Sequence, residues 1–586
     1  MLTFYEALAA FAVGLTAFYL ISLLTSRTKK KQEPWIRPNR MLLQICIALL
    51  IMFAFTPILL FMGGPRPLWF FIFLVITFIV SCVAVKAYQS WKLALLTNIV
   101  IAAIVVLSIY SSMGAVGHGS FLLGDGFDIA SEFIIRDGNF ANAWLNEPYF
   151  RFFPATSTSY ALLSITSGVN VSTSFLLLGV IQTVLLTVVI TLMAKFFSND
   201  PTIALLALPF ILSNPRLGVW IPHASLLSLL FAALLIYFIV LRFNPARQRN
   251  MDRYFVVLLF LLGLSSVVNH SAGPLAITLF IGGLVIFEVL NRKLKRTKAL
   301  SLHYSGRILV LFLVITLAYW AYTYAFYSMV PRVTSTFEWL WNFLHTGEPV
   351  HAYLPQQTLQ SPMEAYCWAV PFALVTAFAL LWFKELFKKT ELPSSKDSYT
   401  NLIPVAIAFL SIPLIIFSFV VKLATTYASS ERYFSAAVYL LVLLISPIIV
   451  KKMLNRKLAS IFVISSLVAL LFIGSTSYTW SIDRIIGKTV YEDELVGGKI
   501  SSMIDNSTCV YTTNSYLISR LALDNVTFNQ GNPAIFDAIL QGLTMPKNDP
   551  ASATTVYIYD PMIMGVLSDQ NVSVVYQSSR YVAFTP

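Results

Sequence analysis

Residues 68–87 read LWFFIFLVITFIVSCVAVKA, an apolar stretch in which Lys86, next to its end, is the one charged residue. A helix of about 20 residues rises about 30 Å, the thickness of the hydrocarbon core of a bilayer, so this stretch is predicted to cross a membrane. Comparable stretches recur along the chain and predict an all-α polytopic membrane protein with about fourteen transmembrane helices. They lie at 3–24, 41–63, 68–87, 93–112, 173–195, 201–213, 222–241, 254–269, 272–291, 308–327, 364–386, 402–424, 434–450 and 458–475. The run at 201–213 is short and is also compatible with a re-entrant segment.

The loops between these stretches differ in charge according to the side of the membrane on which they are predicted to lie. One set of alternate loops holds 27 of the 40 Lys and Arg residues, whereas the opposite loops hold six. Because cytoplasmic loops of membrane proteins carry the excess of basic residues, the first set is predicted to be cytoplasmic. The protein is therefore expected in the plasma membrane, with both termini outside. The loops 113–172 and 328–363 also lie outside, and no Asn-X-Ser/Thr sequon, Asn269-His-Ser included, falls in a cytoplasmic loop.

The composition excludes an ordinary soluble domain. Hydrophobic residues make up 57% of the chain, charged residues make up 11%, and the mean hydropathy is +0.75. The net charge of +13 is carried mainly by short loops, where it is expected to face anionic lipid headgroups rather than nucleic acid. The four cysteines show neither a disulfide framework nor the spacing of metal ligands.

Four parts are predicted along the chain. The transmembrane helices of residues 1–112 precede a large extracytoplasmic loop at 113–172, a transmembrane core at 173–478 and an extracytoplasmic domain at 479–586. In the last part, segments with the pattern of strands alternate with segments that read as helices, which predicts a small α/β domain. Its predicted strands are Cys509–Tyr511, Thr555–Tyr559, Val572–Tyr576 and Tyr581–Phe584, and its predicted helices are Ile500–Ile504, Leu517–Leu523 and Ile535–Leu543.

The loop 113–172 contains a cluster of acidic residues. Gly124-Asp125-Gly126-Phe127-Asp128 is followed one helical turn later by Glu132. The flanking glycines leave room for a substrate to approach Asp125 closely. A solvated turn followed by a helix N-cap is the alternative interpretation. The spacing of apolar residues predicts two helices in this loop, one at the membrane surface over Ile129–Asp137 and an amphipathic one over Thr158–Ile165, before Gly168.

Around this cluster the residues follow a recognisable order. An apolar span is followed by Asp125, an amphipathic helix, the turn Asp137-Gly138-Asn139-Phe140 and the aromatic run Tyr149–Pro154. This order resembles the first outer loop of the glycosyltransferase-C (GT-C) superfamily, membrane enzymes that take a sugar from a polyprenyl-phosphate carrier. The resemblance implies Asp125 as the main catalytic acid, Asp128 as its companion and Phe153-Pro154 as the aromatic-Pro motif. The family often has adjacent acids and a second Pro, whereas here the acids lie three residues apart and Ala155 replaces that Pro.

A late loop on the predicted outer side carries the charged pair Glu431-Arg432. An arginine remains charged and binds phosphate oxygens through two parallel hydrogen bonds. GT-C enzymes commonly carry a basic residue in a late outer loop that contacts the carrier phosphate, and the resemblance implies this role for Arg432, with Arg151 as an alternative. A Glu–Arg pair at the membrane interface is the competing interpretation.

The other candidates are polar and aromatic residues at the predicted outer surface that are expected to line a substrate cavity. The histidines among them lack the spacing of a metal site, so a hydrogen-bonded histidine at the interface is the alternative interpretation. No cofactor follows from the sequence, and a divalent metal is left open. These cavity candidates are Glu132, Tyr149, His223, His270, Tyr427 and Glu431.

The expected function is that of a membrane glycosyltransferase. Its donor is a polyprenyl- or dolichyl-phosphate sugar, its acceptor is a hydroxyl of a glycan, lipid or protein, and direct displacement inverts the anomeric centre. The Trp-Trp-Asp-Tyr-Gly motif of the oligosaccharide-transferring branch is missing, which favours transfer of a single or short sugar. A flippase or other transporter, and a polymerase or ligase of lipid-linked glycans, are the alternatives.

Overall fold

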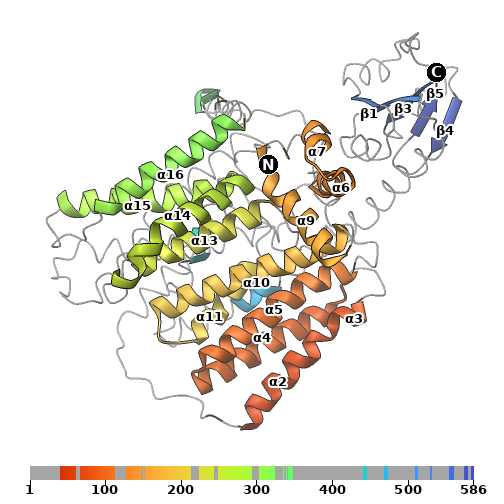
Figure 1. The fold of residues 1–586 in the computed structure, drawn as a ribbon. Coiled ribbons are helices and arrows are strands. Elements are labelled where there is room, and N and C mark those ends of the chain that lie inside the picture. Colours follow the sequence, from red (N-terminus) through yellow and green to blue (C-terminus); the bar gives the residue numbers. More distant parts are fainter. Residues whose placement is uncertain are drawn as a thin grey trace. The chain divides into compact units, whose positions relative to one another are not determined.

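A computed structural model describes a set of helices and a β-sheet (Figure 1). The chain divides into two compact units. The helical unit comprises residues 1–112 and 179–480, and the mixed unit comprises residues 113–178 and 481–586. The structure describes residues 38, 40–60, 66–112, 127–146, 150, 152–169, 171–212, 224–242, 248–293 and 303–323, single turns within 334–346, 440–444 and 467–472, and the strands listed below.

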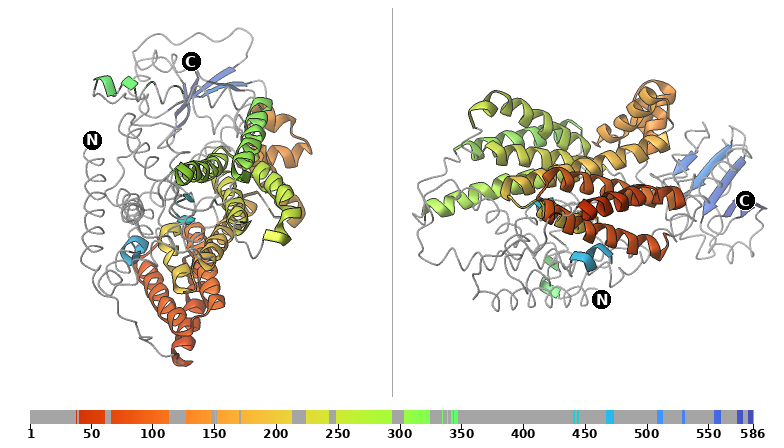
Figure 2. Two further views of the ribbon diagram at one scale, coloured as in Figure 1. Left: turned by 90° about the vertical axis from the view of Figure 1, so that its left-hand side faces the viewer. Right: turned by 90° about the horizontal axis from the view of Figure 1, so that it is seen from below.

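The first group of helices in the helical unit follows the predicted apolar stretches. α4 packs against α2 and α5, α3 packs against α5, and α11 packs against both α4 and α5 (Figures 1 and 2). The group comprises α2 (Arg40–Ala54), α3 (Thr56–Leu60), α4 (Leu68–Tyr88), α5 (Trp91–Ser112), the part of α10 (Val171–Phe197) from residue 179 onward, α11 (Thr202–Leu206) and α12 (Leu208–Leu212).

A second group of helices packs around α13, which contacts both α14 and α15, while α16 contacts the same two helices. Val256 of α14 and Val310 of α16 are each 61% exposed, as expected for side chains that face lipid. The group comprises α13 (Ala224–Arg242), α14 (Gln248–Asn269), α15 (Ala272–Lys293) and α16 (His303–Tyr322).

Among the described residues, four helical stretches are long and apolar enough to cross a membrane, and shorter apolar helices accompany them. The four are Arg40–Leu60, Leu68–Tyr88, Trp91–Ser108 and Leu177–Phe197. Together they confirm a multi-pass membrane protein. The predicted spans at 3–24, 364–386 and 402–424, and most of those at 434–450 and 458–475, lie outside the described residues.

The predicted span at 201–213 is not one helix but two short, fully buried ones, α11 and α12. Pro209 lacks an N–H group, so the helical hydrogen bonds are interrupted where the two meet. Asn98 of α5, whose side chain is buried, donates from Nδ2 to the carbonyl oxygen of Ala204 over 3.0 Å and to Thr191 Oγ1 of α10 over 2.9 Å. A broken helix is tolerated at membrane depth when a neighbouring side chain satisfies its backbone in this way.

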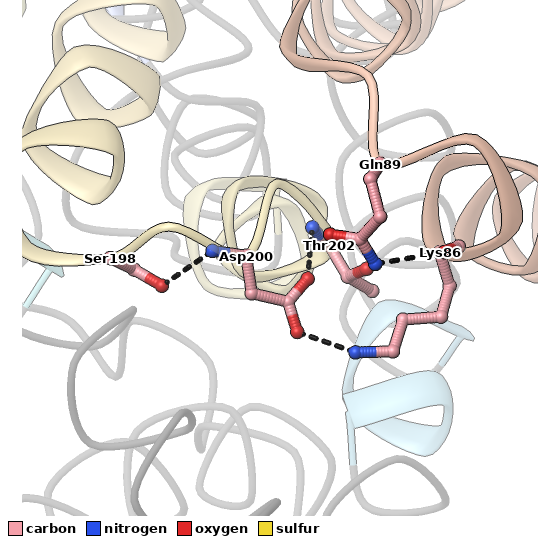
Figure 3. Close-up of polar contacts among 5 residues, drawn as sticks. All are labelled: Lys86, Gln89, Ser198, Asp200 and Thr202. Carbon is pink, nitrogen blue, oxygen red and sulfur yellow. Dashed lines mark hydrogen bonds and ion pairs between the residues drawn. The ribbon is translucent and has the colours of Figure 1, made fainter. Parts of the chain in front are cut away.

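Two turns of the helical unit meet in a polar junction (Figure 3). Lys86 Nζ, at the end of α4, lies 2.6 Å from Asp200 Oδ2 in the connection between α10 and α11. Asp200 Oδ1 also accepts the N–H of Thr202 over 3.1 Å. Burial alone raises the pKa of the Asp200 carboxyl, but Lys86 and the Thr202 amide outweigh it and hold that pKa below its usual value. The junction brings together two connections that the charge pattern assigns to the same, cytoplasmic side.

The helical part of the mixed unit confirms both helices predicted in the loop 113–172. α6 (Phe127–Asp137) packs against α7 (Ala141–Asn146) and α9 (Pro154–Ser167). A small apolar core holds the three helices together, and α9 ends at Gly168, whose φ of 70° is the left-handed conformation that glycine adopts without strain. This core consists of Ala130, Phe133, Ile134, Ala143, Phe150 and Ala161.

The C-terminal part of the mixed unit is a five-stranded sheet of order β2-β1-β3-β5-β4; β1, β3, β5 and β4 are labelled in Figure 1. β1 runs parallel to β2 and β3, and β5 runs antiparallel to β3 and β4. Four strands coincide with predicted segments, whereas the three-residue β2 has too little pattern to be predicted. The strands are β1 (Thr508–Thr512), β2 (Phe528–Gln530), β3 (Thr554–Tyr559), β4 (Ser573–Gln577) and β5 (Val582–Thr585); the three predicted helices of this domain lie outside the described residues.

Candidate functional site

The structure describes only part of the candidate site. Glu132 and His270 are described with their side chains, and Asp128 is placed by its backbone in the first turn of α6. The other candidates lie outside the described residues, so their roles stay predictions. They are Asp125, Tyr149, Arg151, His223, Tyr427, Glu431 and Arg432.

α6 separates its acidic positions from its apolar core. Ala130, Phe133 and Ile134 are buried against α7 and α9, and Ser131 Oγ donates to the carbonyl oxygen of Ser157 in α9 over 2.9 Å. Ala130, Phe133 and Ile134 therefore form the buried face of α6. Asp128 and Glu132 are one turn apart and therefore share a face of α6, on the opposite side from this core.

The turn after α6 is stabilised by contacts among its own backbone and side chains. Gly138 has a φ of 64°, which favours glycine, and its N–H donates to the carbonyl oxygen of Ile134 over 3.0 Å, so α6 ends there. Asn139 Oδ1 then accepts the N–H of Ala141 over 2.8 Å and begins α7. Arg136 Nε pairs with Asp137 Oδ1 over 2.8 Å. The motif Asp137-Gly138-Asn139 thus ends one helix and begins the next.

The aromatic-Pro element begins α9. Pro154 occupies the first position of the helix, where its missing N–H costs nothing, and Phe153 is only 1% exposed. The pair therefore orients α9 relative to the core of the mixed unit, which explains the residue types at these two positions without a contact to a substrate.

His270 lies in the two-residue connection between α14 and α15 and is 2% exposed. Its ring Nδ1 accepts the N–H of Ala272, the first residue of α15, over 3.2 Å. Asn269, which precedes it, is 3% exposed and donates from Nδ2 to the carbonyl oxygen of Ser265 over 2.7 Å. This burial makes the Asn269-His-Ser sequon inaccessible to glycosylation in the folded protein.

A buried set of hydrogen bonds joins the α14–α15 connection to α13. We call the three residues Ser228, Ser266 and Gly273 the serine clasp. Ser228 Oγ lies 2.6 Å from the carbonyl oxygen of Ser266 and 2.9 Å from that of His270, and it accepts the N–H of Gly273 over 3.1 Å. Ser266 Oγ donates back to the carbonyl oxygen of Ser228 over 3.0 Å. A Cβ atom at Gly273 would overlap with both hydroxyl groups. Isolated Ser and Gly residues in apolar helices carry no sequence signal that predicts this cluster.

A second feature that the sequence does not predict is a buried arginine between α3 and α4. Arg66 is 5% exposed, its Cζ lies 5.2 Å from the centroid of the Phe71 ring and 5.8 Å from that of Phe70, and its Nη1 lies 3.4 Å from Ser108 Oγ in α5. The charge pattern of the sequence identifies Arg66 only as one of the few basic residues in the outer loops. In the structure it ties the start of α4 to the last turns of α5, the helix that leads into the loop 113–172.

No group of three or more His, Cys, Asp or Glu side chains is placed to hold a metal ion within the described part of the chain.

No protein-family model matches the sequence, and a search of curated proteins found no match. A search of solved structures found the crystal structure of ArnT from Cupriavidus metallidurans bound to undecaprenyl phosphate, with a TM-score of 0.51 and 13% sequence identity. The similarity covers 84% of this chain and 98% of the ArnT chain. ArnT is a GT-C glycosyltransferase. The chain has the GT-C fold.

The GT-C fold confirms the resemblance drawn from the loop 113–172 and extends it from that one loop to most of the chain. At 13% identity it is the fold that is shared, because side chains at equivalent positions have largely changed. The chemistry of this protein therefore has to be argued from its own residues.

Proposed function

We propose that this protein is a membrane glycosyltransferase that moves a sugar from a polyprenyl- or dolichyl-phosphate carrier to an acceptor hydroxyl on the outer face of the membrane. The GT-C fold over most of the chain is the observation that carries the proposal, and the similar structure of ArnT was solved with undecaprenyl phosphate bound. The acceptor is a hydroxyl of a glycan, a lipid or a protein.

The reaction is a single displacement. The acceptor oxygen forms a bond to the anomeric carbon while the bond between that carbon and the phosphate oxygen breaks, so the anomeric centre is inverted. The carboxylate of Asp125, with Asp128 as its companion, takes the proton of the acceptor hydroxyl. The carrier phosphate leaves with the electron pair of the broken bond and needs no proton, because it is an anion at neutral pH.

Binding of the leaving phosphate is assigned to Arg432, with Arg151 as the alternative. A guanidinium holds two phosphate oxygens in parallel hydrogen bonds and stabilises the charge that develops on them.

The test is transfer of radiolabelled sugar from a polyprenyl-phosphate donor in proteoliposomes. Asp125→Asn keeps the shape of the side chain and removes the base, so the rate should fall by about two to four orders of magnitude. Asp137→Asn is the matched control, because it makes the same change in the same loop but affects an ion pair at the other end of α6. Equal activity of the two variants would remove Asp125 from the mechanism.

The transporter alternative makes a different prediction for the same vesicles. A flippase moves the lipid-linked sugar from one leaflet to the other and leaves the bond between sugar and phosphate intact. The transporter alternative would be supported if wild-type protein moved the donor between leaflets and consumed none of it with any acceptor supplied. That result would contradict the glycosyltransferase proposal.

A further inference from the structure

An apolar groove, open to the surface, lies along the first half of α16. It has a volume of about 410 Å³, and its described lining consists of Gly306, Arg307, Val310, Leu311 and Val314. Sites for small molecules usually have volumes of about 300–1,000 Å³, so the groove is large enough to hold part of a ligand. Apart from the guanidinium of Arg307 the lining side chains are apolar, so an occupant that fits this groove is mainly apolar as well.

Gly306 leaves room in the groove. A Cβ atom added at Gly306 would have no heavy atom within 4 Å, so the space beside the backbone is open. The neighbouring side chains on the same helix, Val310, Leu311 and Val314, are 61%, 43% and 57% exposed. In a membrane protein such exposed apolar side chains face acyl chains rather than water. The groove is therefore a hollow in a surface that contacts lipid.

Arg307 lies at one end of the groove and at the boundary of the apolar part of α16. That part runs from Gly306 to Tyr322, and Arg307 is its one charged residue. Arg307 is exposed and makes no hydrogen bond or ion pair within the part of the chain that the structure describes. An arginine at the end of a membrane span extends its charge to the level of the lipid headgroups. The N-terminus of α16 lies at the same end, and its helix dipole also favours an anion.

The length of the groove matches the depth of one leaflet. The residues from Arg307 to Val314 rise about 10 Å along the helix, at 1.5 Å per residue. The hydrocarbon core of a bilayer is about 30 Å thick, so each leaflet contributes about 15 Å. A chain that begins beside Arg307 and follows the groove therefore stays within one leaflet. The acyl chain of a phospholipid has this reach, whereas the chain of a polyprenyl carrier is several times longer.

We propose that this groove binds an anionic phospholipid of the membrane, with its phosphate at Arg307 and one acyl chain along Gly306, Val310 and Val314. A guanidinium holds two phosphate oxygens in charge-assisted hydrogen bonds, and the apolar side chains contact the acyl chain. The charge pattern of the sequence predicts that this end of α16 is cytoplasmic, which is the leaflet in which anionic lipids are concentrated. A lipid in this groove does not require that the protein transfers a sugar.

Three substitutions distinguish a specific lipid site from the general attraction of a basic residue to a membrane. Gly306→Leu fills the groove and keeps Arg307, and it should fold because nothing lies near the added Cβ and Leu is the better helix former. Arg307→Gln removes the charge and keeps the groove. Arg40→Gln is the matched control, because Arg40 is an exposed arginine at the start of another apolar span, Arg40–Leu60, and does not line the groove.

The experiment measures binding of phosphatidylglycerol to the full-length protein by native mass spectrometry, after release from nanodiscs that contain phosphatidylglycerol and phosphatidylcholine in equal amounts. Wild type should retain phosphatidylglycerol in preference. Gly306→Leu and Arg307→Gln should each weaken this binding about tenfold, at an unchanged melting temperature in lipid-free detergent. Arg40→Gln should leave the binding nearly unchanged. Should Gly306→Leu not fold, Val310→Phe fills the same groove from an exposed position and should have the same effect.

Other results would contradict the lipid site. Equal losses of binding in Arg307→Gln and Arg40→Gln would show only the general attraction of arginine to anionic lipid. Unchanged binding in Gly306→Leu would show that the groove holds no lipid. Preferential displacement of phosphatidylglycerol by undecaprenyl phosphate would identify the polyprenyl carrier as the ligand instead. A change of oligomeric state in Gly306→Leu, with lipid binding unchanged, would show that a second copy of the chain occupies the groove.

Discussion

The serine clasp and the Lys86–Asp200 junction do the same task by different means. Each joins the end of one helix to a connection between two others within the helical unit. The clasp is fully buried and uses only neutral groups, whereas the Lys86 side chain is 55% exposed and the pair is ionic. Burying a charge in a membrane costs much free energy, and an ion pair that is exposed to water stabilises a protein only weakly. A buried hydroxyl group costs little free energy when all its hydrogen bonds are made. The two regions should therefore respond very differently to substitution.

The largest effect is expected at Gly273. Because a Cβ atom there would overlap with both clasp hydroxyls and with the backbone of Ser228, Gly273→Ala must push α13 and α15 apart. We expect a loss of about 3 kcal/mol or more of stability, seen as low yield or early melting in detergent. Gly282→Ala is the control in the same helix, since nothing lies within 4 Å of its added Cβ, and it should be neutral or slightly stabilising. Similar melting of the two variants would contradict the role of the clasp.

A smaller effect is expected when one hydroxyl of the clasp is removed. Ser228→Ala leaves the N–H of Gly273 and the carbonyl oxygen of His270 without this partner in a buried site, which costs about 1–3 kcal/mol. The neighbouring helix supplies the comparison: Ser265 is only partly buried, so Ser265→Ala should change the melting temperature much less.

The ionic junction should contribute less still. A double-mutant cycle with Lys86→Met and Asp200→Asn is expected to give a coupling of about 0.2–1 kcal/mol, because both side chains are partly exposed and solvent screens them. The coupling should shrink in 1 M salt, whereas the effect of Ser228→Ala should not change. A coupling that is independent of salt would show that the pair behaves as a buried one.

The smallest effect is the dependence of this junction on pH. The pKa of Asp200 is lowered in the folded protein, so its contribution is present above the unfolded pKa of about 3.9 and is lost as the pH falls through the folded value. Melting curves of wild type and Asp200→Asn should therefore differ at pH 6 and converge as the pH is lowered below about 4. Curves that diverge on acidification would show that the pKa of Asp200 is raised, not lowered, in the folded protein.

Where the structure departs from the sequence pattern, contacts with distant parts of the chain explain the difference. Hydropathy alone treats residues 201–213 as one span, yet Pro209 divides it, and the break persists because Asn98 from a distant helix satisfies Ala204. Asn269-His-Ser reads as a sequon, yet tertiary packing buries Asn269. β2 carries no alternating pattern, and only its pairing with β1 makes it a strand. Each departure depends on a partner far away in the sequence.

Sequence by itself determined the class of this protein. The membrane spans follow from the length of the apolar stretches. The helices of the loop 113–172 and four strands of the C-terminal sheet follow from apolar periodicity, because that periodicity reflects which face of a local element is buried. The order of residues that begins at Asp125 also resembles the first outer loop of the GT-C superfamily.

Only the tertiary structure decided how the helices are joined. The contacts of Asn98, Arg66 and the serine clasp link residues between 38 and 106 positions apart, and such contacts leave no periodic trace. The orientation of the His270 ring likewise depends on its contact with the N–H of Ala272. The local sequence pattern indicates which environment each face of an element contacts. A buried polar contact depends instead on how two distant side chains are positioned by packing.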